Sequence, residues 1–201
     1  MIETAWKHIP KSERPNLVNR LNQLHHEDLF SLTQTRLKTG CLPWFPGWQL
    51  LKATDYAWHP FLTMYFFRQS PTIIKLDGTV QPFARLCARS VPWLNTANVY
   101  AYARFYMGSI QGAEGSFRLV NKDSPLSFNR EATTSEIQTI RQTIKRPNIV
   151  KRHHGWLIET TLFYDDGIYD AQLMVTTRGI IKIRSEKLRV DNMPIREIML
   201  K

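Results

Sequence analysis

The segment Trp156–Glu186, which reads WLIETTLFYDDGIYDAQLMVTTRGIIKIRSE, decides the fold predicted for this chain. Apolar and polar residues alternate along most of it, which is the pattern of strands with one buried face. A two-residue turn at Asp166-Gly167 would pair the first two strands and give them a common apolar face. That face would carry Trp156, Ile158, Thr160, Leu162, Tyr164, Tyr169, Ala171, Leu173 and Val175, and the opposite face Glu159, Thr161, Asp170 and Gln172.

The hydrophobic pattern also selects the connection to a third strand. A three-residue turn over 177–179, with Gly179 in the left-handed conformation, places Leu173 opposite Ile183 on the apolar side. A two-residue turn would reverse the faces of the third strand. The sequence therefore predicts a three-stranded antiparallel meander.

Helical spacing of apolar residues precedes this meander. The clearest helix begins at Thr133, which forms a Thr-x-x-Glu capping box with Glu136 ahead of a run of isoleucines. Further helices are expected from Ser12 to about Leu24, over Glu27–Lys38, from Thr54 or Asp55 to Arg68, over Pro82–Arg89 and over Ala97–Ile110. Short strands are expected at Ile73–Leu76 and Phe117–Val120.

These elements predict an α+β fold in which N-terminal helices pack on a C-terminal antiparallel sheet. The sheet would contain the three-strand meander plus one or two further short strands. The chain has 201 residues, of which 43% are hydrophobic, and no stretch of it reads as a linker. This length suits one core, so we predict a single α+β domain over 1–201.

The cysteines and the apolar segments indicate the cellular location and whether a membrane span is expected. Cys41 and Cys87 are the only cysteines and form no Cys-x-x-Cys pair, so neither a disulfide scaffold nor a zinc site is expected. The segment 1–14 has no uninterrupted apolar stretch like that of a signal peptide, and 58–67 is too short to span a bilayer. We therefore expect a cytoplasmic protein without a membrane span.

The formal net charge of +10 favours an acidic partner such as nucleic acid, an anionic membrane surface or an acidic protein. Basic residues are concentrated in the segment 141–154, which contains no acidic residue. Clustered cations can neutralise several phosphates at once. The predicted anion-binding site consists of Arg141, Lys145, Arg146, Lys151, Arg152, His153 and His154. The same residues also suit a helix C-terminus and an exposed connection, and no recognised nucleic-acid motif accompanies them.

A second candidate site lies in the segment 42–48, where prolines and a glycine alternate with large rings. This composition predicts an irregular loop whose rings keep it against the protein. Trp44, Phe45 and Trp48 could bind a protein partner or a small apolar ligand, with Trp44 and Trp48 the most exposed. Ordinary packing in the core and anchoring of the loop explain most of these rings, and a ligand or partner site is the alternative.

The residues considered for catalysis are Glu159 and Asp170, which share the polar face of the predicted sheet, and His154. No nucleophile elbow, phosphate loop or dinucleotide motif is present, and nothing requires a cofactor. No metal site is predicted, because neighbours in the His25–Asp28 run point in different directions along a helix.

Three hypotheses of function follow. The preferred one is a non-catalytic binding or accessory module that engages a protein partner or a small apolar ligand. The second is binding of nucleic acid or another polyanion through the segment 141–154. The third is a small pocket enzyme that uses acid-base residues. The oligomeric state is left open by the sequence.

Overall fold

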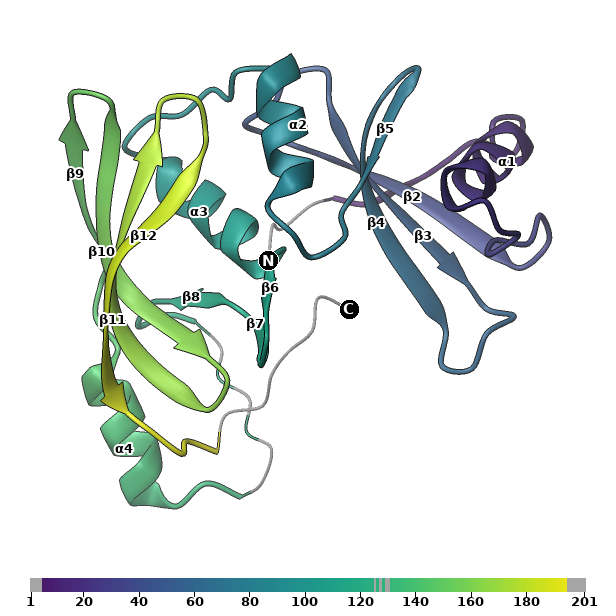
Figure 1. Cartoon of the computed structure of the whole chain (residues 1–201). Helices are drawn as coiled ribbons and strands as arrows, with labels where there is room; N and C mark the ends of the chain where they lie inside the picture. Colours follow the sequence, from purple (N-terminus) through teal and green to yellow (C-terminus); the bar gives the residue numbers. More distant parts are fainter. Residues whose placement is uncertain (1–4, 125, 127, 129–130, 195–201) are drawn as a thin grey trace. The chain divides into compact units, whose positions relative to one another are not determined.

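The computed structural model of the chain describes residues 5–124, 126, 128 and 131–194. Contacts within the chain divide it into two compact units, one over Glu3–Leu76 and the other from Asp77 onward. They are called the N-terminal and C-terminal units below, and each builds its own antiparallel sheet (Figure 1). A division by compactness does not test whether either unit folds alone, so a single domain stays a prediction.

The N-terminal unit is a five-stranded antiparallel meander whose strands follow one another in sequence order. The strands are β1 (Lys7–His8), β2 (Thr35–Cys41), β3 (Gln49–Asp55), β4 (Leu62–Gln69) and β5 (Thr72–Lys75). One helix, α1 (Arg14–His25), lies between β1 and β2 in the sequence. Its buried residues Leu17, Val18 and Leu21 form a core with Leu51 and Phe66 of the sheet. The face of this sheet that packs against α1 is therefore hydrophobic.

Asp55, at the end of β3, fixes the chain that connects α1 to β2. Its buried carboxylate accepts hydrogen bonds from the Ser31 amide at 2.6 Å, the Thr35 hydroxyl at 2.7 Å and the Ala57 amide at 2.7 Å. Burial raises the pKa of this carboxyl, and the three hydrogen bonds lower it, so that it lies below its usual value. The burial of the Asp55 carboxylate is thus explained by its structural role, which is to hold the chain before β2 in place.

The C-terminal unit is built on a sheet in the order β12-β11-β10, and both β8 and β9 pair with the far edge of β10. Its strands are β6 (Gln111–Gly112), β7 (Gly115–Ser116), β8 (Arg118–Val120), β9 (Asn148–Arg152), β10 (Gly155–Tyr164), β11 (Gly167–Thr176) and β12 (Ile181–Val190). Its helices are α2 (Gln81–Arg89), α3 (Val99–Gly108) and α4 (Thr134–Thr143). The two strands β6 and β7 form a separate two-stranded ribbon.

Helices contact both faces of this sheet. On one face, Tyr100 of α3 meets Thr160 of β10, with 3.3 Å between their hydroxyl oxygens. On the other face, Ile140 of α4 packs in a cluster with Phe163 and Ile168. The capping box predicted at Thr133 and Glu136 is confirmed. The part of the second face that α4 does not cover is left for polar side chains.

The predicted meander is confirmed, with one correction. Leu173 lies opposite Ile183 and Gly179 is left-handed with φ +82, as the three-residue turn requires. The first turn, however, is Asp165-Asp166 rather than Asp166-Gly167, since Tyr164 pairs with Gly167. Each residue of β10 thus has a partner two positions away from the one predicted, and a shift of two preserves the faces. Leu173 is buried, whereas Ile183 near the edge is partly exposed.

The predicted fold class, with N-terminal helices packed on a C-terminal sheet, is wrong. No helix forms over Glu27–Lys38, which contains the start of β2, or from Thr54 or Asp55 to Arg68, which contains the end of β3 and most of β4. In β4, Phe66 and Phe67 point to opposite faces, yet both are buried. A strand with two buried faces loses its alternation and resembles a buried helix in the sequence.

Candidate functional site

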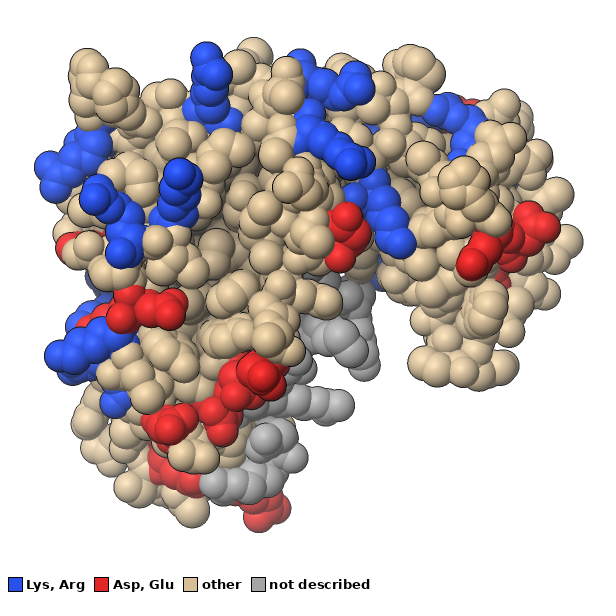
Figure 2. Space-filling view, viewed as in Figure 1, with Lys and Arg blue, Asp and Glu red and all other residues tan. Residues whose placement is uncertain are grey.

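The predicted basic segment does not converge on one surface. Arg141 lines a cavity of about 540 Å³ beside α4, and Lys145 and Arg146 lie at a different groove. Lys151 and Arg152 are exposed on β9. His153 and His154 follow in the exposed β9–β10 turn, with 4.3 Å between their ring centroids. The lysines and arginines visible in Figure 2 likewise form several separate groups.

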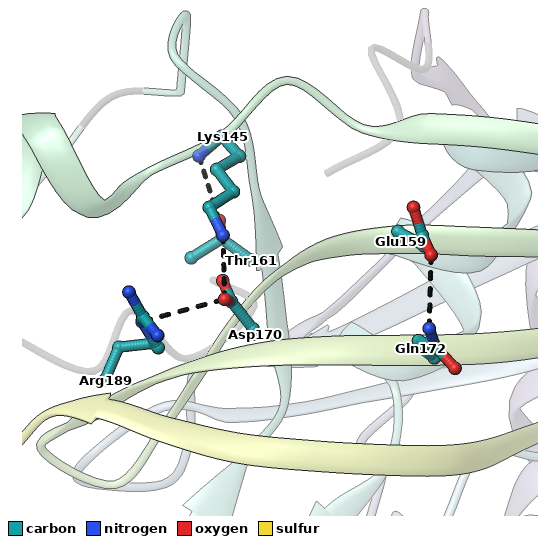
Figure 3. Close-up of polar contacts among 6 residues, drawn as sticks. All are labelled: Lys145, Glu159, Thr161, Asp170, Gln172 and Arg189. Carbon is teal, nitrogen blue, oxygen red and sulfur yellow. Dashed lines mark hydrogen bonds and ion pairs between the residues drawn. The ribbon is translucent and has the colours of Figure 1, made fainter.

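The groove beside Lys145 contains both carboxylates considered for catalysis. It encloses about 390 Å³ on the outer face of β10, β11 and β12. Glu159 accepts hydrogen bonds from Asn148 at 3.0 Å and from Gln172 at 3.1 Å. Figure 3 shows the Gln172 contact, and a second group in which Asp170 faces two cations.

Asp170 is held by charge. Its Oδ2 lies 2.7 Å from the Lys145 ammonium and 3.6 Å from Nε of Arg189 (Figure 3). The Lys145 backbone amide also donates to the Thr161 hydroxyl at 3.0 Å. These contacts anchor the chain between α4 and β9 on the sheet.

The charges along the groove cancel. Its lining includes three basic residues, Lys145, Arg146 and Lys187, and three acidic residues, Glu159, Asp170 and Glu186. A groove of zero formal charge does not attract a polyanion. The two carboxylates are each engaged by their own donors. The polar residues of the groove therefore form a network of contacts that stabilises the sheet.

The rings of the aromatic loop are buried, which confirms the predicted anchoring of the loop, whereas the expected exposure of Trp44 and Trp48 is wrong. Trp44, Phe45 and Trp48 expose 2%, 0% and 3% of their surface. The loop turns through hydrogen bonds from the Phe45 amide to the Leu42 carbonyl and from the Trp48 amide to the Phe45 carbonyl, both of 3.0 Å. The rings serve as loop anchors, because a partner cannot reach them without moving the loop.

A site that the sequence did not reveal lies on the N-terminal sheet, on the face opposite α1. Strand pairing places His8, Lys38, Lys52 and Tyr65 in one row across β1 to β4. Arg36 stands on the same face, one row further along β2, because side chains two residues apart share a face. Arg36, Lys38 and Lys52 are called the cation face.

Lys38 and Lys52 are directly opposite each other on neighbouring strands. Like charges in this position destabilise a sheet. Burial and then the charge of Lys38 lower the pKa of Lys52. Among the described residues, no carboxylate forms an ion pair with any cation of this face. Within the part of the chain that the structure describes, the cation face is thus a concentration of unpaired positive charge, unlike the neutral groove of the C-terminal unit.

Aromatic rings flank these cations. The Lys52 ammonium lies 5.6 Å from the centroid of the Tyr65 ring, and the Arg36 guanidinium carbon lies 4.9 Å from that of Tyr56. Each tyrosine has an exposed aromatic neighbour. The ring centroids of Trp6 and Tyr65 are 6.3 Å apart, and those of Phe61 and Tyr56 are 4.7 Å apart. The cation face therefore combines positive charge with two half-buried tyrosine rings and two exposed rings.

Comparison with known proteins does not assign this chain to a family or a function. No family model, no curated protein and no solved structure matches this chain. In the described ranges, no helix has the length and hydropathy needed to cross a membrane. Within the same ranges, no three His, Cys, Asp or Glu side chains are grouped as a metal site would require. Function must therefore be argued from the surfaces described above.

Proposed function

We propose that this chain is a non-catalytic polyanion-binding module whose binding surface is the cation face of the N-terminal sheet. The observation that carries the proposal is the direct opposition of Lys38 and Lys52 without a carboxylate partner among the described residues. The pairing costs stability in the free protein. A bound polyanion would remove that cost, because its negative charges would lie against both ammonium groups.

Binding would draw its free energy from released counterions. Each phosphate neutralised by a lysine or arginine frees condensed salt ions, so affinity falls as the salt concentration rises. Three cations on one face would give a measurable salt dependence. The overall charge of +10 supports association by attracting an anion before contact.

The other hypotheses have less support from the described geometry. Engagement of a partner by Trp44 and Trp48 would require exposure of buried rings. An enzyme acting through Glu159 and Asp170 would first have to release both carboxylates from their present donors. Binding at Lys151 and Arg152 remains the direct competitor, since both are exposed cations on an edge strand.

Titration calorimetry with inorganic polyphosphate tests the proposal over a range of salt concentrations. The variant Lys38→Gln/Lys52→Gln should bind much more weakly and show a shallower salt dependence. The matched control is Lys151→Gln/Arg152→Gln, which removes the same charge from the competing site. If the control loses binding while the first variant retains it, the cation face is not the binding surface.

A further inference from the structure

We infer that the polyanion bound by the cation face is single-stranded nucleic acid, with its phosphates on the cations and its bases stacked on the neighbouring rings. This inference rests on the function proposed above and adds the class of ligand. Two of the cations, Arg36 and Lys52, each lie over an aromatic ring, which a plain charged surface would not require.

The same local arrangement occurs twice on this face. Lys52 lies over Tyr65, which has Trp6 as its neighbour, and Arg36 lies over Tyr56, which has Phe61 as its neighbour. Each unit of a single strand offers one phosphate and one base, so a cation beside a ring matches one repeating unit of that ligand.

One ring of each arrangement lies in β4 or directly before it. Tyr65 is in β4 and Phe61 is just before its first residue, a distance of four residues in sequence. Four residues of an extended strand span about 13 Å. This separation exceeds the reach of adjacent units, so two bases that are not direct neighbours in the single strand would lie on the two ring pairs.

The space between the ring pairs is polar. Thr54 of β3 and Thr63 of β4 are directly opposite, with 3.1 Å between their hydroxyl oxygens. One hydroxyl proton joins the two oxygens, which leaves the other proton and the remaining oxygen lone pairs for a ligand. Hydroxyl groups at this position suit the base edges and phosphates of a single strand.

Other polyanions fit this face less well. An acidic peptide or an anionic membrane surface would meet the cations but would leave the rings without stacking partners. A nucleic acid duplex keeps its bases stacked on one another, so their faces are closed to the rings. Single-stranded nucleic acid satisfies both the charge and the rings.

The experiment compares a fluorescein-labelled oligothymidine with an abasic oligonucleotide of equal length, both measured by fluorescence anisotropy with the full chain. Trp6→Leu and Tyr65→Leu should each weaken oligothymidine binding about tenfold, the effect expected for loss of one stacked base. Binding of the abasic strand should not change. Trp93→Leu is the matched control, because Trp93 is an exposed ring in the C-terminal unit. Circular dichroism checks that each variant is folded.

The outcomes separate the two proposals. Equal affinity for both oligonucleotides, with no effect of either ring variant, overturns nucleic-acid binding and leaves polyanion binding intact. Tighter binding of polyglutamate or of phosphatidylserine vesicles also overturns it, in favour of an acidic protein or a membrane surface. If Lys38→Gln/Lys52→Gln binds every anion as well as the unmodified chain does, the function proposed above fails as well.

Discussion

The substitution Lys38→Gln separates stability from binding. Lys38 is directly opposite Lys52, and glutamine keeps most of its stem while removing its charge. Relief of a directly opposed like-charge pair is worth roughly 0.2–1 kcal/mol. In a chain of this length, a gain of that size raises Tm by up to about 4 °C. The contact between Lys52 and the Tyr65 ring is retained, so the gain is not offset there.

Salt gives this prediction a second signature. Opposed side chains in a sheet are about 5 Å apart at their Cβ atoms, which is less than the Debye length of about 8 Å at physiological ionic strength. The repulsion is therefore only partly screened there, whereas near 1 M salt the Debye length is about 3 Å and the gain should shrink. The Lys38→Gln substitution should also lower the affinity for a polyanion. For a single-stranded ligand, it should reduce the slope of log K against log salt by about 0.7.

Thermal unfolding followed by circular dichroism measures the first effect, and anisotropy titrations at several salt concentrations measure the second. Lys7→Gln is the control, because Lys7 lies on the other face of the same sheet, opposite the neutral Thr39. A destabilised Lys38→Gln variant, or one with unchanged affinity, would refute the view that this pair sacrifices stability for binding.

Three further predictions concern the core, the pH response and domain organisation. Tyr102→Phe removes a buried hydroxyl that donates to the Gly179 carbonyl at 2.6 Å. We expect the free energy of unfolding, measured in urea, to fall by about 1–3 kcal/mol. An unchanged free energy would mean that the carbonyl finds another donor. Burial, followed by the charge of Lys75, lowers the pKa of His25. The unfolded chain then binds a proton more readily than the folded chain, so stability should decline as pH falls through about 6.5. His25→Gln should flatten that decline, and an equally steep profile would contradict the assignment. Calorimetry should show one cooperative unfolding transition if 1–201 is a single domain, and two transitions would show that the units unfold separately.

The elements that the sequence predicted well are those in which local rules agree. In β10 to β12, alternation selects the faces and the turn at Gly179 agrees with it, and the buried Leu173 confirms them; the Asp166-Gly167 signal misplaced the first turn by one residue without changing the faces. The capping box at Thr133 identifies α4 for the same reason. In the N-terminal unit, β5 was predicted but β2, β3 and β4 were missed. In β4, Phe66 and Phe67 are buried on opposite faces, which removes the alternation that indicates a strand.

The cation face could not be read from the chain because it depends on register. Lys38 and Lys52 are distant in sequence, and only the pairing of β2 with β3 brings them opposite each other. Alternation in Thr35–Cys41, where Leu37 is buried between Arg36 and Lys38, was the available signal. The segment 141–154 shows the converse: its cations are neighbours in sequence, yet folding distributes them over different surfaces.

The most direct test of the account is a titration of the isotope-labelled chain with oligothymidine, followed by amide chemical shifts in NMR spectra. The account predicts that the largest shifts fall on β2, β3 and β4 around Arg36, Lys38, Lys52 and Tyr65. Shifts concentrated in the segment 141–154, with these strands unaffected, would contradict it.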